Sequence, residues 1–193
     1  MTSDALKGIE RIISLHKDAA LVKAAVNGDE KSFEKLIASH KKRIKAVGAS
    51  FFTNQDDIED FVQEVFVKAY VNLSNFRYEA SFSTWITRIA YNIAISSKKR
   101  AKEFMPLVND EIIQDKKCTP EEEQIRNITI EAVREALTGL PEKYAICLEL
   151  YFFHDRSYNE IELICNIPVN TIKSHIFRAK KILREKLRGF YEN

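Results

Sequence analysis

The chain has 193 residues, 45% of them hydrophobic, so it can bury a core and does not have the composition of a disordered chain. Only 5 glycines and 4 prolines are present, which leaves few turn formers and predicts an all-α fold. The formal net charge of +2 says little about partners, but acidic and basic residues cluster in different segments, which is typical of a protein with one basic and one acidic partner.

Several kinds of site find no support in the residue pattern. Cys118, Cys147 and Cys165 are odd in number and far apart, which argues against a disulfide framework or a zinc site. The histidines lack metal-ligand spacing, and no Gly-rich phosphate loop or nucleophile with a nearby base is present, so we expect no metal, no cofactor and no enzymatic activity. Because no signal peptide or apolar run of about 18 residues occurs, we expect a cytoplasmic protein without stable membrane insertion.

The first half of the chain predicts a series of helices. Helical spacing covers residues 4–26, and Asp29 is placed to cap a following helix. The clearest helix covers 57–72, with one apolar face formed by Ile58, Phe61, Val62, Val65, Phe66, Ala69 and Tyr70. A second stripe on this helix consists of Asp60, Glu64, Val67 and Val71. Acids mixed with outward valines suit a protein partner, although ordinary half-buried positions explain the valines equally well.

An aromatic loop from residue 73 leads into a helix predicted over 83–100. The helix buries an isoleucine-rich face, while Trp85, Arg88 and Asn92 share another face. Aromatic rings stack on unpaired bases, with about 1–3 kcal/mol per base, and arginines bind phosphates. The loop 75–82 with this helix face is therefore suited to capturing a flipped base. The alternative is that the aromatics anchor the loop, which we favour for Phe82 and leave open for Trp85.

The second half predicts a linker followed by four helices. Periodicity weakens over 102–119, which separates a domain at 18–101 from one at 120–193 and leaves 1–17 as an N-terminal helical extension. The four helices are predicted at 120–138, 141–153, 158–165 and 168–189. Capping boxes are expected at Thr119–Glu122 and at Ser157–Glu160.

The last two helices have the pattern of a helix-turn-helix. Asn166 suits a left-handed turn, and Pro168 suits the start of a helix whose apolar face holds Ile172, Ile176, Ala179 and Leu183. The opposite side carries Thr171, Lys173, Ser174, Arg178 and Lys181. Arg178 can pair bidentately with guanine, and the lysines can bind phosphates. The alternative is an amphipathic helix with a solvated basic face.

Four segments in this order resemble bacterial sigma factors of the extracytoplasmic-function (ECF) group. They are DIEDFVQEVFVKAY, SFSTWITRIAYN, LPEKYAICLEL and SYNEIELICNIPVNTIKSHIFRAKKIL, and the resemblance runs from about residue 18 to 188. It implies two small helical domains, sigma-2 and sigma-4, joined by a flexible linker. It also implies binding to core RNA polymerase and promoter DNA, promoter recognition, DNA melting and transcription initiation, with an anti-sigma factor as a further partner.

The resemblance also implies roles for individual residues. Core-polymerase binding falls on Asp57, Asp60, Gln63, Glu64, Phe66 and Val67. Contact with the minus-ten element falls on Phe76, Arg77, Ser81, Trp85, Arg88 and Asn92. Contact with the minus-thirty-five element falls on Thr171, Lys173, Ser174, His175, Phe177, Arg178 and Lys181.

The sequence departs from the family pattern at three positions. Asn166 replaces the usual turn glycine, Glu162 replaces a small residue, and His175 stands where arginine is frequent. The competing hypothesis is a helix-turn-helix regulator that never binds core polymerase, and polymerase binding separates the two.

Overall fold

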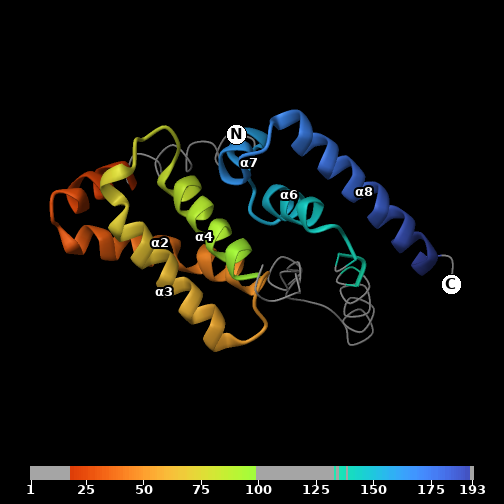
Figure 1. The fold of residues 1–193 in the computed structure, drawn as a ribbon, viewed down its shortest axis with the longest axis horizontal. Helices are drawn as coiled ribbons and strands as arrows, with labels where there is room; N and C mark the ends of the chain where they lie inside the picture. Colours follow the sequence, from red (N-terminus) through yellow and green to blue (C-terminus); the bar gives the residue numbers. More distant parts are fainter. Residues whose placement is uncertain (1–17, 99–132, 134, 138, 192–193) are drawn as a thin grey trace, which may run out of the picture. The chain divides into compact units, whose positions relative to one another are not determined.

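The computed structural model describes residues 18–98, 133, 135–137 and 139–191, and every regular element in these ranges is helical, as predicted. The helices are residues 18–26, α2 (Glu30–Ala49), α3 (Gln55–Val71), the 3-10 helix η1 (Leu73–Asn75), α4 (Phe82–Lys98), α6 (Glu142–Phe152), α7 (Tyr158–Cys165) and α8 (Val169–Tyr191) (Figure 1). Apart from residues 163–165, the chain divides into two compact units between residues 100 and 101. The extension 1–17, the linker 102–119 and the Thr119–Glu122 capping box lie outside the described residues.

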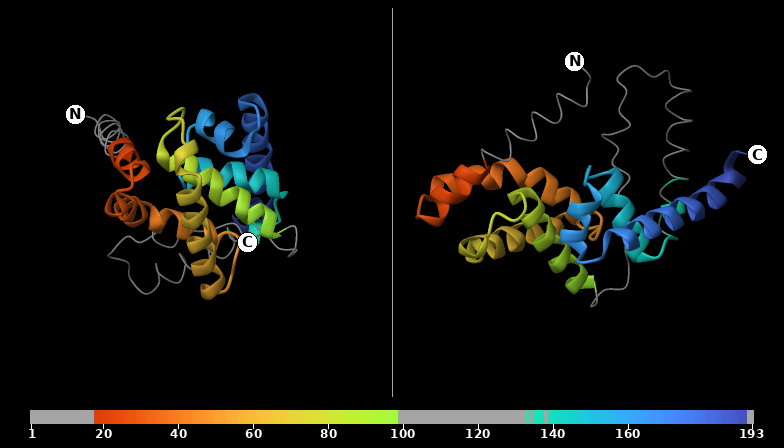
Figure 2. Two further views of the ribbon diagram at one scale, coloured as in Figure 1. Left: turned by 60° about the vertical axis from the view of Figure 1, so that its left-hand side comes forward. Right: turned by 90° about the horizontal axis from the view of Figure 1, so that it is seen from above.

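Helices α2, α3 and α4 pack against one another to form the first unit, as the two views of Figure 2 show. Each helix contributes fully buried side chains to the shared core, among them Leu36, Val65 and Ile86. Gly48 allows the close approach of α2 to α3, because a Cβ there would lie 2.8 Å from Cδ1 of Phe61. Packing in this core therefore determines which face of α3 is buried and which face is exposed.

Helix α3 begins two residues before its predicted start. The side chain of Asn54 accepts a 3.0 Å hydrogen bond from the backbone N–H of Asp56, so the cap lies just ahead of Gln55. Six of the seven residues predicted to face inward are buried. The prediction is wrong for Tyr70, which is 51% exposed and lies edge-on against Phe33 with ring centroids 4.9 Å apart.

A buried polar pair ties helix 18–26 to α2. Nε2 of His40 lies 2.9 Å from Oδ2 of Asp18, and each residue is 5% exposed. The ring of His40 also lies 5.3 Å, between centroids, from the ring of Phe82 at the start of α4. His40 therefore contacts both helix 18–26 and the start of α4. Asp29 stands at the predicted N-cap position of α2, but its side chain makes no capping hydrogen bond to the backbone and instead accepts a 2.6 Å hydrogen bond from the hydroxyl of Ser32.

The second unit is centred on the packing of α6 against α8. Its core cluster consists of Leu137, Leu140, Ala145, Leu148 and Ala179. The predicted capping box at Ser157–Glu160 is confirmed at the start of α7. Asn166 has φ 55° and ψ 44°, which confirms the predicted left-handed turn before α8. On α8, Ile172 and Ile176 are buried as predicted, whereas Leu183 is only half-buried. The helix-turn-helix geometry is thus present.

Candidate functional site

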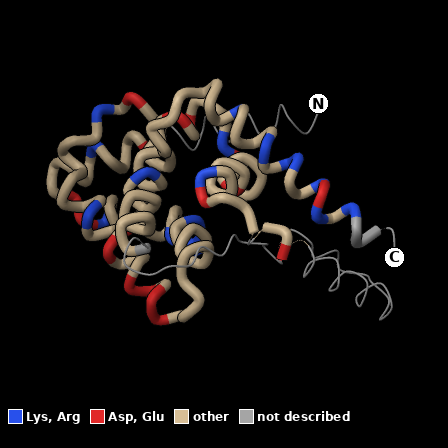
Figure 3. Tube along the Cα trace, turned by 45° about the vertical axis from the view of Figure 1, so that its right-hand side comes forward, with Lys and Arg blue, Asp and Glu red and all other residues tan. Residues whose placement is uncertain are grey.

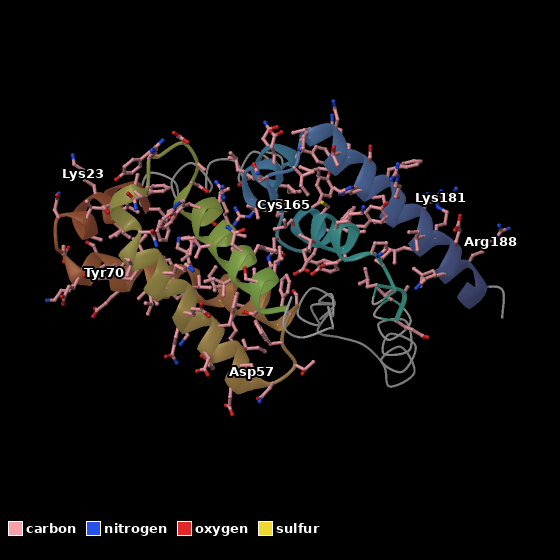
Figure 4. All side chains as sticks on the ribbon, viewed as in Figure 1. Lys23, Asp57, Tyr70, Cys165, Lys181 and Arg188 are labelled. Atoms are coloured by element: carbon pink, nitrogen blue, oxygen red, sulfur yellow. The ribbon has the colours of Figure 1, made fainter. Side chains whose placement is uncertain are left out.

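The outward face of α3 carries acidic residues together with exposed valines. Asp57, Asp60, Gln63 and Glu64 are exposed, and Val67 and Val71 are 63% and 70% exposed. Figure 4 shows the labelled side chain of Asp57 pointing away from α3 near its N-terminal end. Two widely exposed valines on one helix leave apolar surface uncovered, which is what a docking surface offers to a partner.

Phe66 does not share this face, although it was predicted to contact the polymerase. Its side chain is 6% exposed and turns into the core of the unit. A ring in this position holds α3 against its neighbours and cannot touch a partner while the core is intact. The surface candidates on α3 are therefore Asp57, Asp60, Gln63, Glu64 and Val67.

The aromatic residues of the loop before α4 form one cluster. The ring of Phe76 lies 5.3 Å from that of Trp85 and 6.1 Å from that of Phe82, between centroids. Phe82 is 2% exposed, as favoured from the sequence, but Phe76 is also only 8% exposed. A ring covered to this extent cannot offer a full face to a base.

Tyr78 is the exposed member of this cluster, and the sequence did not single it out. Its ring lies 4.8 Å from that of Phe76, is 52% exposed, and has a backbone φ of 58°. A bulky residue at positive φ is uncommon and marks a locally strained turn. The loop therefore presents Tyr78 outward on a base of buried rings.

Ser81 is hydrogen-bonded within the fold, whereas Arg77 is exposed. Oγ of Ser81 accepts a 3.0 Å hydrogen bond from the backbone N–H of Thr84, so Ser81 caps α4. Its hydroxyl also lies 2.8 Å from that of Thr84. Arg77 is exposed on the loop. Of these two predicted minus-ten residues, Arg77 is the one that is open to a ligand.

A groove of about 610 Å³ runs between α3 and α4. Its walls include the three residues predicted to share one face of α4, namely Trp85, Arg88 and Asn92. The opposite wall brings in Glu64 and Lys68 from α3. Lys68 adds a positive charge that the sequence analysis did not assign to this site. Glu64 borders both the groove and the outward face of α3.

The polar side of α8 is open to solvent as predicted. Thr171, Lys173, Ser174, Phe177, Arg178 and Lys181 are exposed, with Phe177 at 70%. Figure 3 shows lysines and arginines recurring along α8, and the labelled Lys181 in Figure 4 points away from the helix. In a helix-turn-helix, basic side chains in the N-terminal half of the second helix can contact phosphates and base edges.

His175 is the exception on α8, because it is only 9% exposed. Its ring lies 5.0 Å from the ring of Tyr144, and Nδ1 lies 3.7 Å from Sγ of Cys147. Burial lowers the pKa of His175, and the charges of Lys143 and Arg178 lower it further. His175 is thus a core residue between α6 and α8 and not an exposed contact for a ligand.

Three residues outside the predicted set support the exposed side of α8. Nη1 of Arg178 donates a 3.2 Å hydrogen bond to the hydroxyl of Tyr144, and Nζ of Lys173 lies 5.7 Å from the ring centroid of Tyr158. Oε1 of Glu162 accepts a 3.1 Å hydrogen bond from the backbone N–H of Val169, the first residue of α8. A carboxylate at a helix N-terminus satisfies a free N–H and opposes the positive end of the dipole.

Comparisons with known proteins bear on both units. The family model for Sigma-70 region 2 matches residues 36–104, and that for Sigma-70, region 4 matches residues 130–183. The chain is 31% identical over 181 residues to the ECF RNA polymerase sigma-E factor of Haemophilus influenzae, covering 88% of this chain and 95% of the relative. The chain belongs to the sigma-70 family, in its ECF group.

Two solved structures have the same fold as this sigma factor. CnrH, solved in complex with the cytosolic domain of CnrY, superposes with a TM-score of 0.68 at 21% identity, covering 90% of this chain and 98% of that one. RpoE of Bartonella quintana, solved with the anti-sigma factor NepR, superposes with a TM-score of 0.62 at 21% identity, covering 82% of this chain and 98% of that one.

Family membership decides between the two hypotheses. A sigma factor of the ECF group directs RNA polymerase to promoters and starts transcription, and it is not itself an enzyme. The regulator hypothesis does not account for a match to region 2, which contains α3 and α4. Within the described residues, no helix is long and apolar enough to cross a membrane, and no cluster of His, Cys, Asp and Glu could hold a metal ion. The first unit is called region 2 below, and the second is called region 4.

Proposed function

We propose that this sigma factor uses three surfaces, one for core RNA polymerase and one for each promoter element. The polymerase surface is the outward face of α3. The minus-ten surface is the loop at 75–82 with the groove between α3 and α4. The minus-thirty-five surface is the polar side of α8.

The α3 surface is the observation that carries the proposal. Val67 and Val71, both more than half exposed, lie on the same helix as the exposed acids Asp57 and Asp60. Burying the valines against a partner removes apolar area from water, and the acids give the contact a charge preference. A basic partner surface with an apolar centre matches this face.

The minus-ten surface suits an unpaired base. Tyr78 offers an exposed ring for stacking, and Phe76 supports it from beneath. In the groove, Arg88 and Lys68 can bind phosphates, while the amide of Asn92 can pair with a base edge. Trp85 joins the two parts, because it contacts Phe76 and lines the groove.

The minus-thirty-five surface suits the major groove of duplex DNA. Thr171, Ser174 and Arg178 are exposed on one helix with Lys173 and Lys181 beside them. Phe177, 70% exposed on the same helix, can contact a thymine methyl group. We expect the affinity to fall as salt rises, because each phosphate contact releases counterions.

An anti-sigma factor is a further proposed partner, and the proposed place of action is the cytoplasm, where RNA polymerase works. The Bartonella quintana relative of the same fold was solved with such a factor.

Run-off transcription with purified core polymerase and a randomised promoter pool tests the proposal. We expect start sites that depend on this protein and share two spaced elements. Val67→Asp and Val71→Asp should lose the complex with core polymerase on a sizing column. Val26→Asp is the matched control, because Val26 is 48% exposed in region 2 but lies outside α3. Equal loss in all three variants would refute the α3 surface.

A further inference from the structure

One hydrogen bond joins α6 to the exposed polar side of α8. Nη1 of Arg178 on α8 donates to the hydroxyl of Tyr144 on α6 at 3.2 Å. We propose that Tyr144 is a positioning residue that orients Arg178 for reading a base of the minus-thirty-five element. This inference rests on the proposed function, because it takes Arg178 as a DNA contact.

Tyr144 is itself held in place from several sides. Its ring is half-buried and lies 5.0 Å from the ring of His175, with 50° between the planes. Nζ of Lys143 lies 5.5 Å from the ring centroid. His175 in turn contacts Cys147 in the core, so the ring of Tyr144 rests on a packed part of the α6–α8 interface. Arg178, by contrast, is exposed and would otherwise sample many rotamers.

The bond leaves the useful edge of the guanidinium free. Arginine has five N–H donors in a rigid planar fork, and the bond to Tyr144 occupies a donor on Nη1. The edge formed by Nη2 and Nε keeps its donors and can pair bidentately with O6 and N7 of guanine. A side chain that is already oriented loses less conformational freedom on binding, which favours the bound state.

The electrostatics of the pair agree with this geometry. The hydrogen bond from Arg178 is the main cause that lowers the pKa of Tyr144, with smaller contributions from the charges of Arg178 and Lys143. A phenol oxygen that accepts from a cation is the arrangement expected when the hydroxyl serves as an anchor. The ring contact with His175 does not need the hydroxyl, so the two roles of Tyr144 can be separated by mutation.

The test measures base preference at each minus-thirty-five position. Run-off transcription from a pool randomised in this element would use the full chain with core polymerase. The variants are Arg178→Ala, Tyr144→Phe, the double variant and Lys181→Gln. Arg178→Ala should remove the preference at one position, and Tyr144→Phe should weaken it at the same position by roughly two- to tenfold. Lys181→Gln is the control for a phosphate contact and should reduce output from all sequences alike.

The double variant separates positioning from a structural role. If Tyr144 acts through Arg178, then Tyr144→Phe should change nothing further in the Arg178→Ala background. The thermal unfolding of each variant is measured alongside, and Tyr144→Phe is expected to fold because it keeps the ring contact with His175.

Three results would overturn the inference in different ways. If Arg178→Ala removes a preference that Tyr144→Phe leaves intact, the positioning role fails and the proposed function stands. If Arg178→Ala changes no preference, the assignment of Arg178 to the promoter fails and the inference falls with it. A uniform loss across all sequences in Tyr144→Phe also contradicts positioning, because it indicates damage to the fold.

Discussion

In region 4 the candidate DNA contacts project from a regular helix, whereas in region 2 they gather around a loop whose aromatic rings are mostly buried. On α8 the side chains at Lys173 and Arg178 are exposed, and the helix beneath them is fixed by Ile172 and Ile176. In region 2, Phe76 and Phe82 belong to the core and to the candidate site at once. In region 4 the candidate DNA contacts are therefore different residues from those that hold the fold together. In region 2 the same aromatic rings serve both purposes.

This difference has a consequence for mutations. A contact residue on α8 can be removed without touching the packing below it, so function and stability should separate. A ring beneath the minus-ten loop supports both the fold and the exposed Tyr78, so function and stability should fall together.

The largest effect is expected from Phe82→Ala. Phe82 is 2% exposed and contacts the rings of Phe76, Trp85 and His40, so we expect a loss of about 3–5 kcal/mol in the free energy of unfolding. Urea unfolding measures this loss by Trp85 fluorescence for region 2, because Trp85 is the only tryptophan and lies there, and by far-ultraviolet circular dichroism so that unfolding of region 4 is also detected. Phe177→Ala is the matched control in region 4, where a 70% exposed ring should cost about 0.5 kcal/mol or less. Similar losses of stability in both variants would show that the two regions do not differ in this way.

Tyr78→Ala should affect promoter opening more than stability. Losing one stacked base is worth about 1–3 kcal/mol, which we expect in the equilibrium between closed and open promoter complexes. Permanganate footprinting of unpaired thymines measures this equilibrium, and Tyr78→Phe should keep most of the opening because it keeps the ring. If Tyr78→Ala opens DNA as well as the unmodified protein does, then Tyr78 does not stack on the unpaired base.

The helices and the region 4 surface could be predicted because their patterns are local. Periodicity identified α3 and α8, and short motifs identified the Ser157–Glu160 capping box and the left-handed Asn166. On a helix, the inward residues at every third or fourth position also define the outward face. Thr171, Lys173 and Lys181 are exposed for this reason.

The remaining features depend on contacts between distant residues. Tyr144 and Arg178 are 34 positions apart, and no local pattern pairs them. The family resemblance placed His175 among the contacts to the minus-thirty-five element, but α6 packs over it. In the loop before α4 no period applies, so the sequence could not show that Phe76 would be covered and Tyr78 exposed.

Ser157→Ala should give a moderate loss confined to region 4. The hydroxyl of Ser157 accepts from the backbone N–H of Glu160, and the Glu160 carboxylate accepts in return from the backbone N–H of Ser157. Removing an N-cap of this kind costs about 1 kcal/mol. Hydrogen–deuterium exchange should show faster exchange in α7 and unchanged exchange in α3. Ser39→Ala is the control, since Ser39 is exposed within α2 and alanine is the better helix former there. Faster exchange in both regions would indicate that the cap also supports region 2.

The smallest effect is expected from mild acid, and it should also be confined to region 4. Burial and the charges of Lys143 and Arg178 lower the pKa of His175 below its ordinary value of 6.5, so the unfolded chain takes up the proton first. The neutral ring's contribution to stability is therefore complete above about pH 6.5 and is lost as the pH falls below that value. The opening free energy of α8, from hydrogen exchange corrected for intrinsic rates, should decrease between about pH 7.5 and 5.5. In His175→Gln, which cannot take up this proton, the decrease should be smaller. An equal decrease in both proteins would assign the pH dependence to another group and leave His175 as a packing residue alone.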